Sequence, residues 1–251
     1  MGKRLVFANQ KGGVGKTTTA VNLGAALAER GKTVLLVDFD PQGNTTSSVG
    51  GNGTGSTIYD VITGKTSAAA AVVPTTMEGL SVLPSSIDLT GATVELVGAE
   101  GREHYLRRAL EPLTPSYDYV FIDCPPSLGV LTLNGLIAAH EVIIPLQCEY
   151  FALEGLKQLL QTIRRVQTRL NPDLRIGGIL FTMYDSRTRL AHEVVQQVTR
   201  YFRKKVFRTI IPRNVRLGEA PSHGRPIMQY DPDCIGSLSY RKLADEVIDH
   251  G

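Results

Sequence analysis

The stretch "QKGGVGKTTTA", residues 10–20, decides the fold of this chain. Its G-K-T end matches the phosphate-binding loop G-x-x-x-x-G-K-[ST], whose glycines let backbone N–H groups approach phosphate oxygens without a Cβ in the way. Gln10 stands where that pattern has its first glycine, and a second lysine, Lys11, precedes the glycines. The stretch therefore predicts a phosphate-binding loop of altered form.

The segments beside this loop predict a strand before it and a helix after it. Residues 4–9, "RLVFAN", form a short apolar run typical of a buried strand, and apolar residues recur at helical spacing over 16–30. The helix N-terminus adds partial positive charge where phosphate would bind. A plain glycine turn is the alternative, but it rarely reads G-G-x-G-K-T-T. We predict that the nucleotide contacts are Gly12, Gly13, Val14, Gly15, Lys16, Thr17 and Thr18.

The rest of the chain continues the same alternation of strands and helices. Further strands are expected at 33–40, 79–85, 117–126, 141–147 and 175–185, and helices at 93–111, 129–139, 153–170, 189–204 and 237–249. The Gly/Ser/Thr/Asn-rich stretch 43–57 reads as loop, with weaker signals over 58–78. Continuous apolar strands between helices imply a parallel sheet covered on both faces. We predict an α/β fold, a single doubly wound, mostly parallel sheet, in one domain over 1–251.

Three aspartates stand at the ends of predicted strands. Asp38 and Asp40 end the run "TVLLVDFD", and Asp123 ends "YVFID". Ligands of open α/β sheets bind at these strand ends, so the aspartates are expected to face the phosphates. Thr17 and Asp123 would serve Mg²⁺, while one of the other two carboxylates organises its water shell and the other orients the attacking water. For Asp40 the alternative is that Asp40-Pro41 only starts a turn.

Composition favours a soluble protein of a reducing compartment. Of 251 residues, 42% are hydrophobic and 20% charged, which is typical of a chain with a packed core. The start "MGKRLVFANQ" lacks the apolar stretch of a signal peptide, and no apolar run approaches the ~20 residues that span a bilayer. The scattered Cys124, Cys148 and Cys234 argue against a cysteine-built metal site. We expect a cytoplasmic location.

Charge is unevenly distributed along the chain. The net charge is only +3, but residues 164–216 contain 13 Lys or Arg and three acidic residues, which gives this segment +10 and leaves −7 elsewhere. Such asymmetry suggests a face that binds a polyanion. For "YFRKKVFR", residues 201–208, the alternative is a solvated end of an amphipathic helix.

Three motifs together resemble the deviant-P-loop ATPases of the ParA/MinD group: K-G-G-V-G-K-T-T, V-D-F-D-P-Q-G-N and D-C-P-P-S. The resemblance implies that Lys11 reaches across a homodimer to the nucleotide phosphates of the partner. It also implies that Lys16 and Asp40 are catalytic, that Asp40 positions the hydrolytic water, and that Thr17 and Asp123 serve Mg²⁺ with support from Asp38. Without the resemblance, Lys11 would be read as a solvated loop lysine.

Two later stretches, "FTMYDSRT" (181–188) and "TIIPRNVRLGEAPSHGRPI" (209–227), are similar to the chromosomal, Soj-like ParA branch. In that branch, residues matching Pro212 and Asn214 lie near the adenine, and those matching Arg187 and Arg216 contact DNA. Both arginines fall within the basic segment, which independently suggests phosphate contacts without base readout.

The resemblance implies a weak ATPase, dependent on ATP and Mg²⁺ and stimulated by DNA, that forms an ATP-sandwich homodimer on non-specific double-stranded DNA. Its partner would be a ParB-like centromere-binding protein, its location the nucleoid, and its cargo a chromosome or a plasmid. One alternative is a MinD-like membrane-cycling or cell-positioning ATPase, although the C-terminal "SYRKLADEVIDHG" lacks the basic, strongly hydrophobic character of a membrane-surface helix. Another is a regulator acting through a replication or transcription partner.

Overall fold

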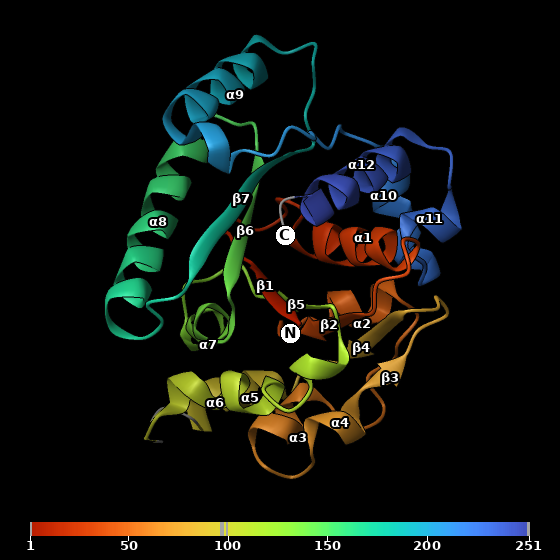
Figure 1. The fold of residues 1–251 in the computed structure, drawn as a ribbon, viewed down its shortest axis with the longest axis vertical. Coiled ribbons are helices and arrows are strands. Elements are labelled where there is room, and N and C mark those ends of the chain that lie inside the picture. Colours follow the sequence, from red (N-terminus) through yellow and green to blue (C-terminus); the bar gives the residue numbers. More distant parts are fainter. Residues whose placement is uncertain (1, 96–97, 99, 250–251) are drawn as a thin grey trace.

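The computed structural model describes residues 2–95, 98 and 100–249, and its centre is a seven-stranded sheet of order β3-β4-β2-β5-β1-β6-β7 (Figure 1). The strands are β1 (Lys3–Phe7), β2 (Val34–Asp38), β3 (Val73–Pro74), β4 (Leu80–Leu83), β5 (Tyr119–Asp123), β6 (Glu141–Gln147) and β7 (Arg175–Thr182). All neighbouring pairs are parallel except β3 and β4, which are antiparallel. The predicted mostly parallel α/β fold is confirmed.

Helices follow the strands in turn. They are α1 (Lys16–Ala28), α2 (Asn44–Ser48), α3 (Ile58–Ile62), α4 (Ala68–Ala71), α5 (Leu89–Glu95), α6 (Tyr105–Leu110), α7 (Val130–Ala138), α8 (Ala152–Arg169), α9 (Arg189–Phe202), α10 (Val215–Glu219), α11 (Ile227–Tyr230) and α12 (Ile235–Asp249). Short 3₁₀ turns include η2 (Arg102–His104), η4 (Arg203–Lys205) and η5 (Ala220–His223). Within the described part of the chain, none of these helices combines the length and apolarity needed to cross a membrane.

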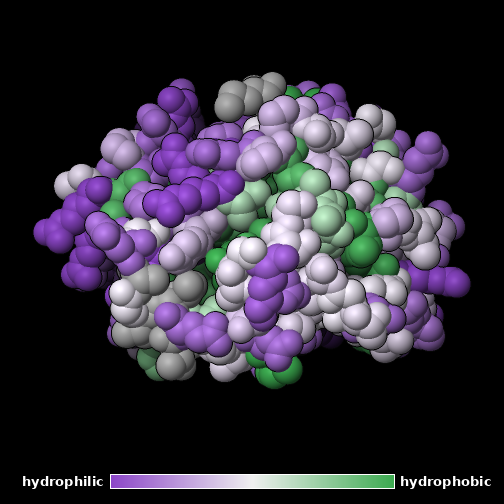
Figure 2. All heavy atoms as spheres, turned by 90° about the horizontal axis from the view of Figure 1, so that it is seen from below, coloured by the Kyte–Doolittle hydropathy of each residue, from purple (hydrophilic) through white to green (hydrophobic). Residues whose placement is uncertain are grey.

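Two hydrophobic clusters lie on opposite faces of the sheet because successive strand side chains alternate between faces. Leu5 and Phe7 of β1 pack with α1 and α12, whereas Val6 packs with α7 and α8. Figure 1 shows α1, α10, α11 and α12 together on one side of the sheet and α5 to α8 on the other. Seen from below, the outer surface is mainly hydrophilic, with hydrophobic residues in a hollow near its middle (Figure 2).

Two sequence-based predictions of local structure are wrong. The single helix expected over 93–111 is interrupted, because α5 ends at Glu95 and η2 begins only at Arg102; part of that prediction, 96–97 and 99, lies outside the described residues. Gly101, with φ 65°, precedes η2 in the left-handed region that glycine tolerates. The expected loop over 43–57 contains α2, a helix built almost entirely of Thr and Ser.

Candidate nucleotide-binding site

The glycine loop joins β1 to α1 at the carboxyl edge of the sheet. Gly13 and Gly15 have φ values of 72° and 85°, a region in which a residue with a Cβ would be strained. Gly15 is the N-cap of α1 and provides no side-chain cap. The first backbone N–H groups of α1 therefore remain available to an anion, and the helix dipole favours one there.

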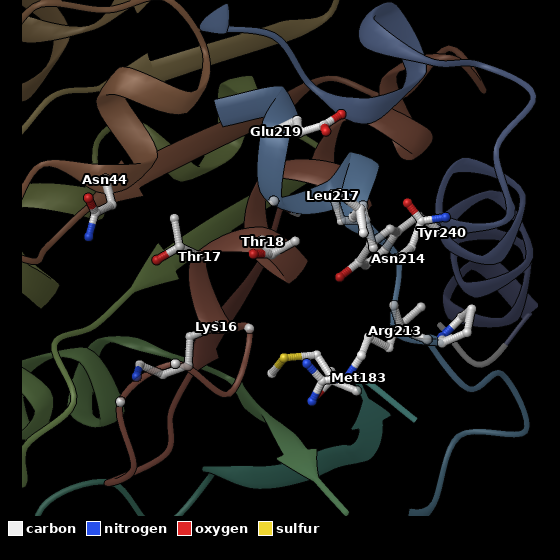
Figure 3. Close-up of a pocket in the computed structure, with 18 of the residues that line it drawn as sticks. Lys16, Thr17, Thr18, Asn44, Met183, Arg213, Asn214, Leu217, Glu219 and Tyr240 are labelled. Carbon is white, nitrogen blue, oxygen red and sulfur yellow. The ribbon is translucent and has the colours of Figure 1, made fainter. Parts of the chain in front are cut away.

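A pocket of about 680 Å³ opens beside this loop (Figure 3). Most of the predicted nucleotide contacts line it, together with the predicted catalytic Asp40: Gly12, Gly13, Gly15, Lys16, Thr17, Thr18, Pro212 and Asn214. Val14 does not; its side chain is buried in the protein, and its carbonyl oxygen accepts a 2.8 Å hydrogen bond from Thr182 Oγ1. Val14 therefore ties the loop to β7, while the glycines face the pocket.

Two buried carboxylates stand behind the pocket wall. Asp38 and Asp123 are the last residues of β2 and β5 and are register partners. Burial raises the pKa of Asp123 to about 6, and burial together with the charge of Asp123 raises the pKa of Asp38 to about 7. Two ionised carboxylates this close together and this deeply buried are unfavourable, although the charge of Lys16 acts in the opposite direction on Asp123. A cation bound beside them would relieve this penalty.

The residues present fit a magnesium ion that arrives with a nucleotide. Thr17 Oγ1 donates a 2.6 Å hydrogen bond to Asp123 Oδ2, while Asp123 Oδ1 is buried without a hydrogen-bond partner. The described residues contain no cluster of three or more His, Cys, Asp or Glu that would form an all-protein metal cage. Mg²⁺ commonly binds to one or two protein groups, phosphates and water instead. Thr17 and Asp123 can supply that share, with Asp38 behind them.

Lys16 and Asp40 both line the pocket. Lys16 is only 7% exposed, and its Nζ lies 3.5 Å from the carbonyl oxygen of Lys11. Burial lowers the pKa of Lys16, although Asp123 and Asp40 act in the opposite direction. The Asp40 carboxylate accepts a 3.0 Å hydrogen bond from the backbone N–H of Gln42, which orients it. The lysine can neutralise phosphate charge, and the carboxylate can orient a water molecule.

Lys11 is held away from this pocket. Its ammonium group forms an ion pair with Glu149, in the loop that follows β6, and the two side chains are 48% and 45% exposed. Lys11 is not among the residues that line the pocket. The two lysines of the loop thus occupy different environments: Lys16 is buried at the pocket, and Lys11 is at the surface.

The far end of the pocket suits a nucleobase. Pro212 and Asn214 line it together with Met183, Leu217 and Tyr240, and Figure 3 shows Asn214, Leu217 and Tyr240 grouped across the pocket from Lys16 and Thr17. Asn214 caps α10, because its Oδ1 accepts a 2.8 Å hydrogen bond from the backbone N–H of Arg216. This wall offers apolar surface with a few polar groups, as nucleotide pockets do.

Both arginines predicted to contact DNA, Arg187 and Arg216, lie near the carboxyl edge of the sheet, and each has carboxylate partners. Arg187, in the loop after β7, has an 85% exposed side chain and pairs with Asp185 at 2.7 Å. Arg216, on α10, pairs with Glu219 at 2.9 Å and Asp231 at 3.3 Å. These partners were not predicted, although Asp185 is two residues from Arg187 and Glu219 is three residues from Arg216.

The basic segment 164–216 does not form one continuous cluster. Arg187, Arg213 and Arg216 are at the carboxyl edge of the sheet, which we name the nucleotide edge because the pocket opens there, and Arg213 lines the pocket. Lys205, in η4, reaches the opposite end of the sheet, because its Nζ donates a 2.9 Å hydrogen bond to the carbonyl oxygen of Ile176 near the start of β7. Because α9 returns the chain from one edge of the sheet to the other, only part of this positive charge is near the pocket.

Comparisons with known proteins agree with this site. A family profile described as an AAA domain matches residues 2–176. The chain is 62% identical over 248 residues to the chromosome-partitioning ATPase Soj of Treponema pallidum (strain Nichols), covering 99% of this chain and 98% of that protein. It is 55% identical over 253 residues to the sporulation initiation inhibitor protein Soj of Bacillus subtilis (strain 168), covering 100% of both.

A solved structure gives the same result for fold and ligands. Cobyrinic acid a,c-diamide synthase from Mycobacterium smegmatis, crystallised with ADP and magnesium, is 45% identical with a TM-score of 0.88, covering 100% of this chain and 95% of that one. ATP and Mg²⁺ are the cofactors of this ATP-hydrolysing family, and the pocket described above fits both. The resemblance seen in the three sequence motifs is confirmed, and the chain belongs to the Soj/ParA family of chromosome-partitioning P-loop ATPases.

Proposed function

We propose that this ATPase is a dimerising switch. ATP joins two copies, and the dimer binds duplex DNA without sequence preference. Hydrolysis then separates the two copies and releases them from the DNA. The observation that supports this most directly is the position of Lys11, which is exposed at the nucleotide edge and paired with Glu149 rather than turned into its own pocket. A loop lysine in this place is free to exchange a surface carboxylate for the phosphates of a second copy. We propose that residues 1–251 act as one ATPase domain.

A cation supplied by a neighbour has a clear chemical use. Charge spreads over the phosphoryl oxygens during transfer, and a positive group delivered from another protein stabilises it, as an arginine finger does. In this proposal Lys16 serves its own nucleotide and Lys11 serves the other one. Nucleotide binding then needs one copy, while efficient hydrolysis needs two.

We expect Lys11→Ala to separate these two steps. The variant should bind ATP as a monomer with near wild-type affinity, because Lys11 lies outside its own pocket. ATP-dependent dimerisation and hydrolysis should be lost, since the cation that crosses the interface is gone. Light scattering coupled to size-exclusion chromatography reports the dimer, and fluorescent ADP binding provides the control. An ATP-dependent dimer of normal stability in this variant would contradict the proposal.

The proposed DNA surface is the nucleotide edge that carries Arg187, Arg213 and Arg216. Arginines there would contact phosphates, so binding would be insensitive to sequence and would weaken steeply with salt. Two copies joined by ATP would double the contacts, and this avidity would make DNA binding depend on nucleotide. A ParB-like partner would stimulate hydrolysis and so cause the dimer to dissociate. The protein would then bind to the nucleoid and leave it in repeated cycles.

Arg216→Glu should weaken DNA binding at least about tenfold and reduce the salt dependence, because each lost phosphate contact lowers the slope by about one. Nucleotide affinity should not change. Arg169→Glu is the matched control: it makes the same charge reversal on an exposed residue at the end of α8, away from the nucleotide edge. Fluorescence anisotropy with a random-sequence duplex, measured over a range of salt concentrations, gives the DNA affinity and its salt dependence for each variant. Equal losses in the two variants would show that the wrong face was chosen.

A regulatory role is a second candidate, since the Bacillus subtilis relative is named as an inhibitor of sporulation initiation. Such a role would use the same switch with a different partner. The MinD-like alternative predicts binding to anionic liposomes in place of DNA. Sedimentation with such liposomes, run beside the DNA assay with ATP, separates that alternative from the proposed function.

A further inference from the structure

Two consecutive threonines of α2 reach the two buried carboxylates. Thr45 Oγ1 donates a 2.7 Å hydrogen bond to Asp123 Oδ2. Thr46 contacts Asp38 Oδ2 twice, with its backbone N–H at 2.7 Å and its Oγ1 at 2.6 Å. The two threonines are 0% and 3% exposed. Hydroxyl groups buried this deeply are retained only where hydrogen bonds satisfy them, and here both use carboxylates.

The geometry explains why adjacent residues can serve different carboxylates. Asp38 and Asp123 end neighbouring strands and are opposite each other in the register. Consecutive side chains of a helix diverge by about 100°, so neighbouring threonines reach neighbouring strands. α2 is thereby fixed across the ends of β2 and β5 at two points.

Thr46 is held so that its proton points to Asp38. Its Oγ1 accepts a 3.0 Å hydrogen bond from the backbone N–H of Ser85, which leaves the hydroxyl proton for the carboxylate. Thr46 therefore anchors α2, and this anchor sets the position from which Thr45 acts.

Thr45 contributes to which oxygen of Asp123 is left without a hydrogen-bond partner. Thr17 and Thr45 both donate to Oδ2, at 2.6 and 2.7 Å, while Oδ1 is buried without a partner. With Oδ2 held by two hydroxyls, the carboxylate cannot rotate freely about its bond to the chain. The other oxygen, Oδ1, is therefore held in one orientation.

We propose that Thr45 is a positioning residue for the magnesium site: it fixes the Asp123 carboxylate so that its free oxygen serves the cation or its water shell, while Thr46 anchors the helix that carries Thr45. The inference rests on the proposed role of Asp123 at the cation. Partners that orient a metal-binding carboxylate commonly change metal affinity about 10- to 100-fold when removed.

The test compares Thr45→Val with Thr45→Ser by fluorescent ADP binding, titrated with MgCl₂ and repeated in EDTA. Valine keeps the shape of threonine and removes the hydroxyl, whereas serine keeps the hydroxyl and removes a methyl group. The measured quantity is the gain in ADP affinity that Mg²⁺ provides. Asp123→Asn is the reference for loss of the carboxylate. If the valine variant does not bind ADP in EDTA, Thr45→Ala replaces it.

We expect Thr45→Val to bind ADP normally in EDTA and to need at least about tenfold more Mg²⁺ for the same gain, while Thr45→Ser stays within about threefold of wild type. If serine loses the gain as valine does, Thr45 acts by packing and the inference is overturned. If Asp123→Asn loses the gain but Thr45→Val keeps it, only this inference fails. If Asp123→Asn keeps the gain, the proposed role of Asp123 fails with it.

Discussion

Lys16→Ala is expected to abolish measurable nucleotide binding, with affinity reduced at least about 100-fold. The lysine is buried and lines the pocket beside the glycine loop, where we propose that the phosphates bind. A charged hydrogen bond to phosphate contributes roughly 1.5–3 kcal/mol, with further Coulombic attraction in a site of low dielectric. The neighbouring Lys11→Ala provides the matched control, since it removes the same charge from the same loop but outside the pocket. Fluorescent ADP titration or calorimetry compares them.

The loss should not arise from unfolding. Burial already lowers the pKa of Lys16, so its charge is held at a cost in the absence of ligand. We therefore expect the thermal midpoint of Lys16→Ala without nucleotide to equal or exceed that of wild type, and the usual stabilisation by Mg-ADP to disappear. Wild-type affinity in this variant would refute the assignment of the phosphate site.

The sheet could be predicted from sequence because its strands are short, continuous apolar runs. "RLVFAN" and "YVFID" correspond to β1 and β5, which are buried on both faces and so show no polar alternation. The order of the strands could not be read from these runs, because each strand would fit any central position in the sheet. β3 was missed altogether, since it has two residues at the exposed edge.

The phosphate loop could be predicted because its chemistry is local: glycines, lysine and threonine act within a few residues of one another. Contacts made by the tertiary fold were not accessible in this way. Thr45 meets Asp123 across 78 positions of sequence, and Lys11 meets Glu149 across 138. A run of threonine and serine reads as loop, because these side chains compete for backbone hydrogen bonds. In α2 the hydroxyls of Thr45 and Thr46 donate to carboxylates instead, while those of Ser47 and Ser48 donate to backbone carbonyls one turn earlier, and the helix forms.

Asp40→Ala is expected to block hydrolysis while leaving an ATP-bound dimer. Asp40 lines the pocket two residues beyond β2, and the hydrogen bond from the Gln42 backbone orients its carboxylate. Removing a group that orients or deprotonates the attacking water commonly costs about 10²–10⁴ in rate. Nucleotide affinity should change little, because the proposed phosphate contacts are Lys16, Thr17 and the glycines, which the substitution leaves in place. Single-turnover phosphate release measures the rate, and light scattering measures the dimer.

Asp40→Asn distinguishes chemistry from architecture at this position. The asparagine side chain can still accept the hydrogen bond from Gln42, so the local turn is preserved, but its amide is not a base. If Asp40 acts on the water, both variants lose hydrolysis and both accumulate as dimers that remain on DNA. If Asp40 only starts the turn at Pro41, Asp40→Asn hydrolyses ATP at the wild-type rate, and another group must orient the water.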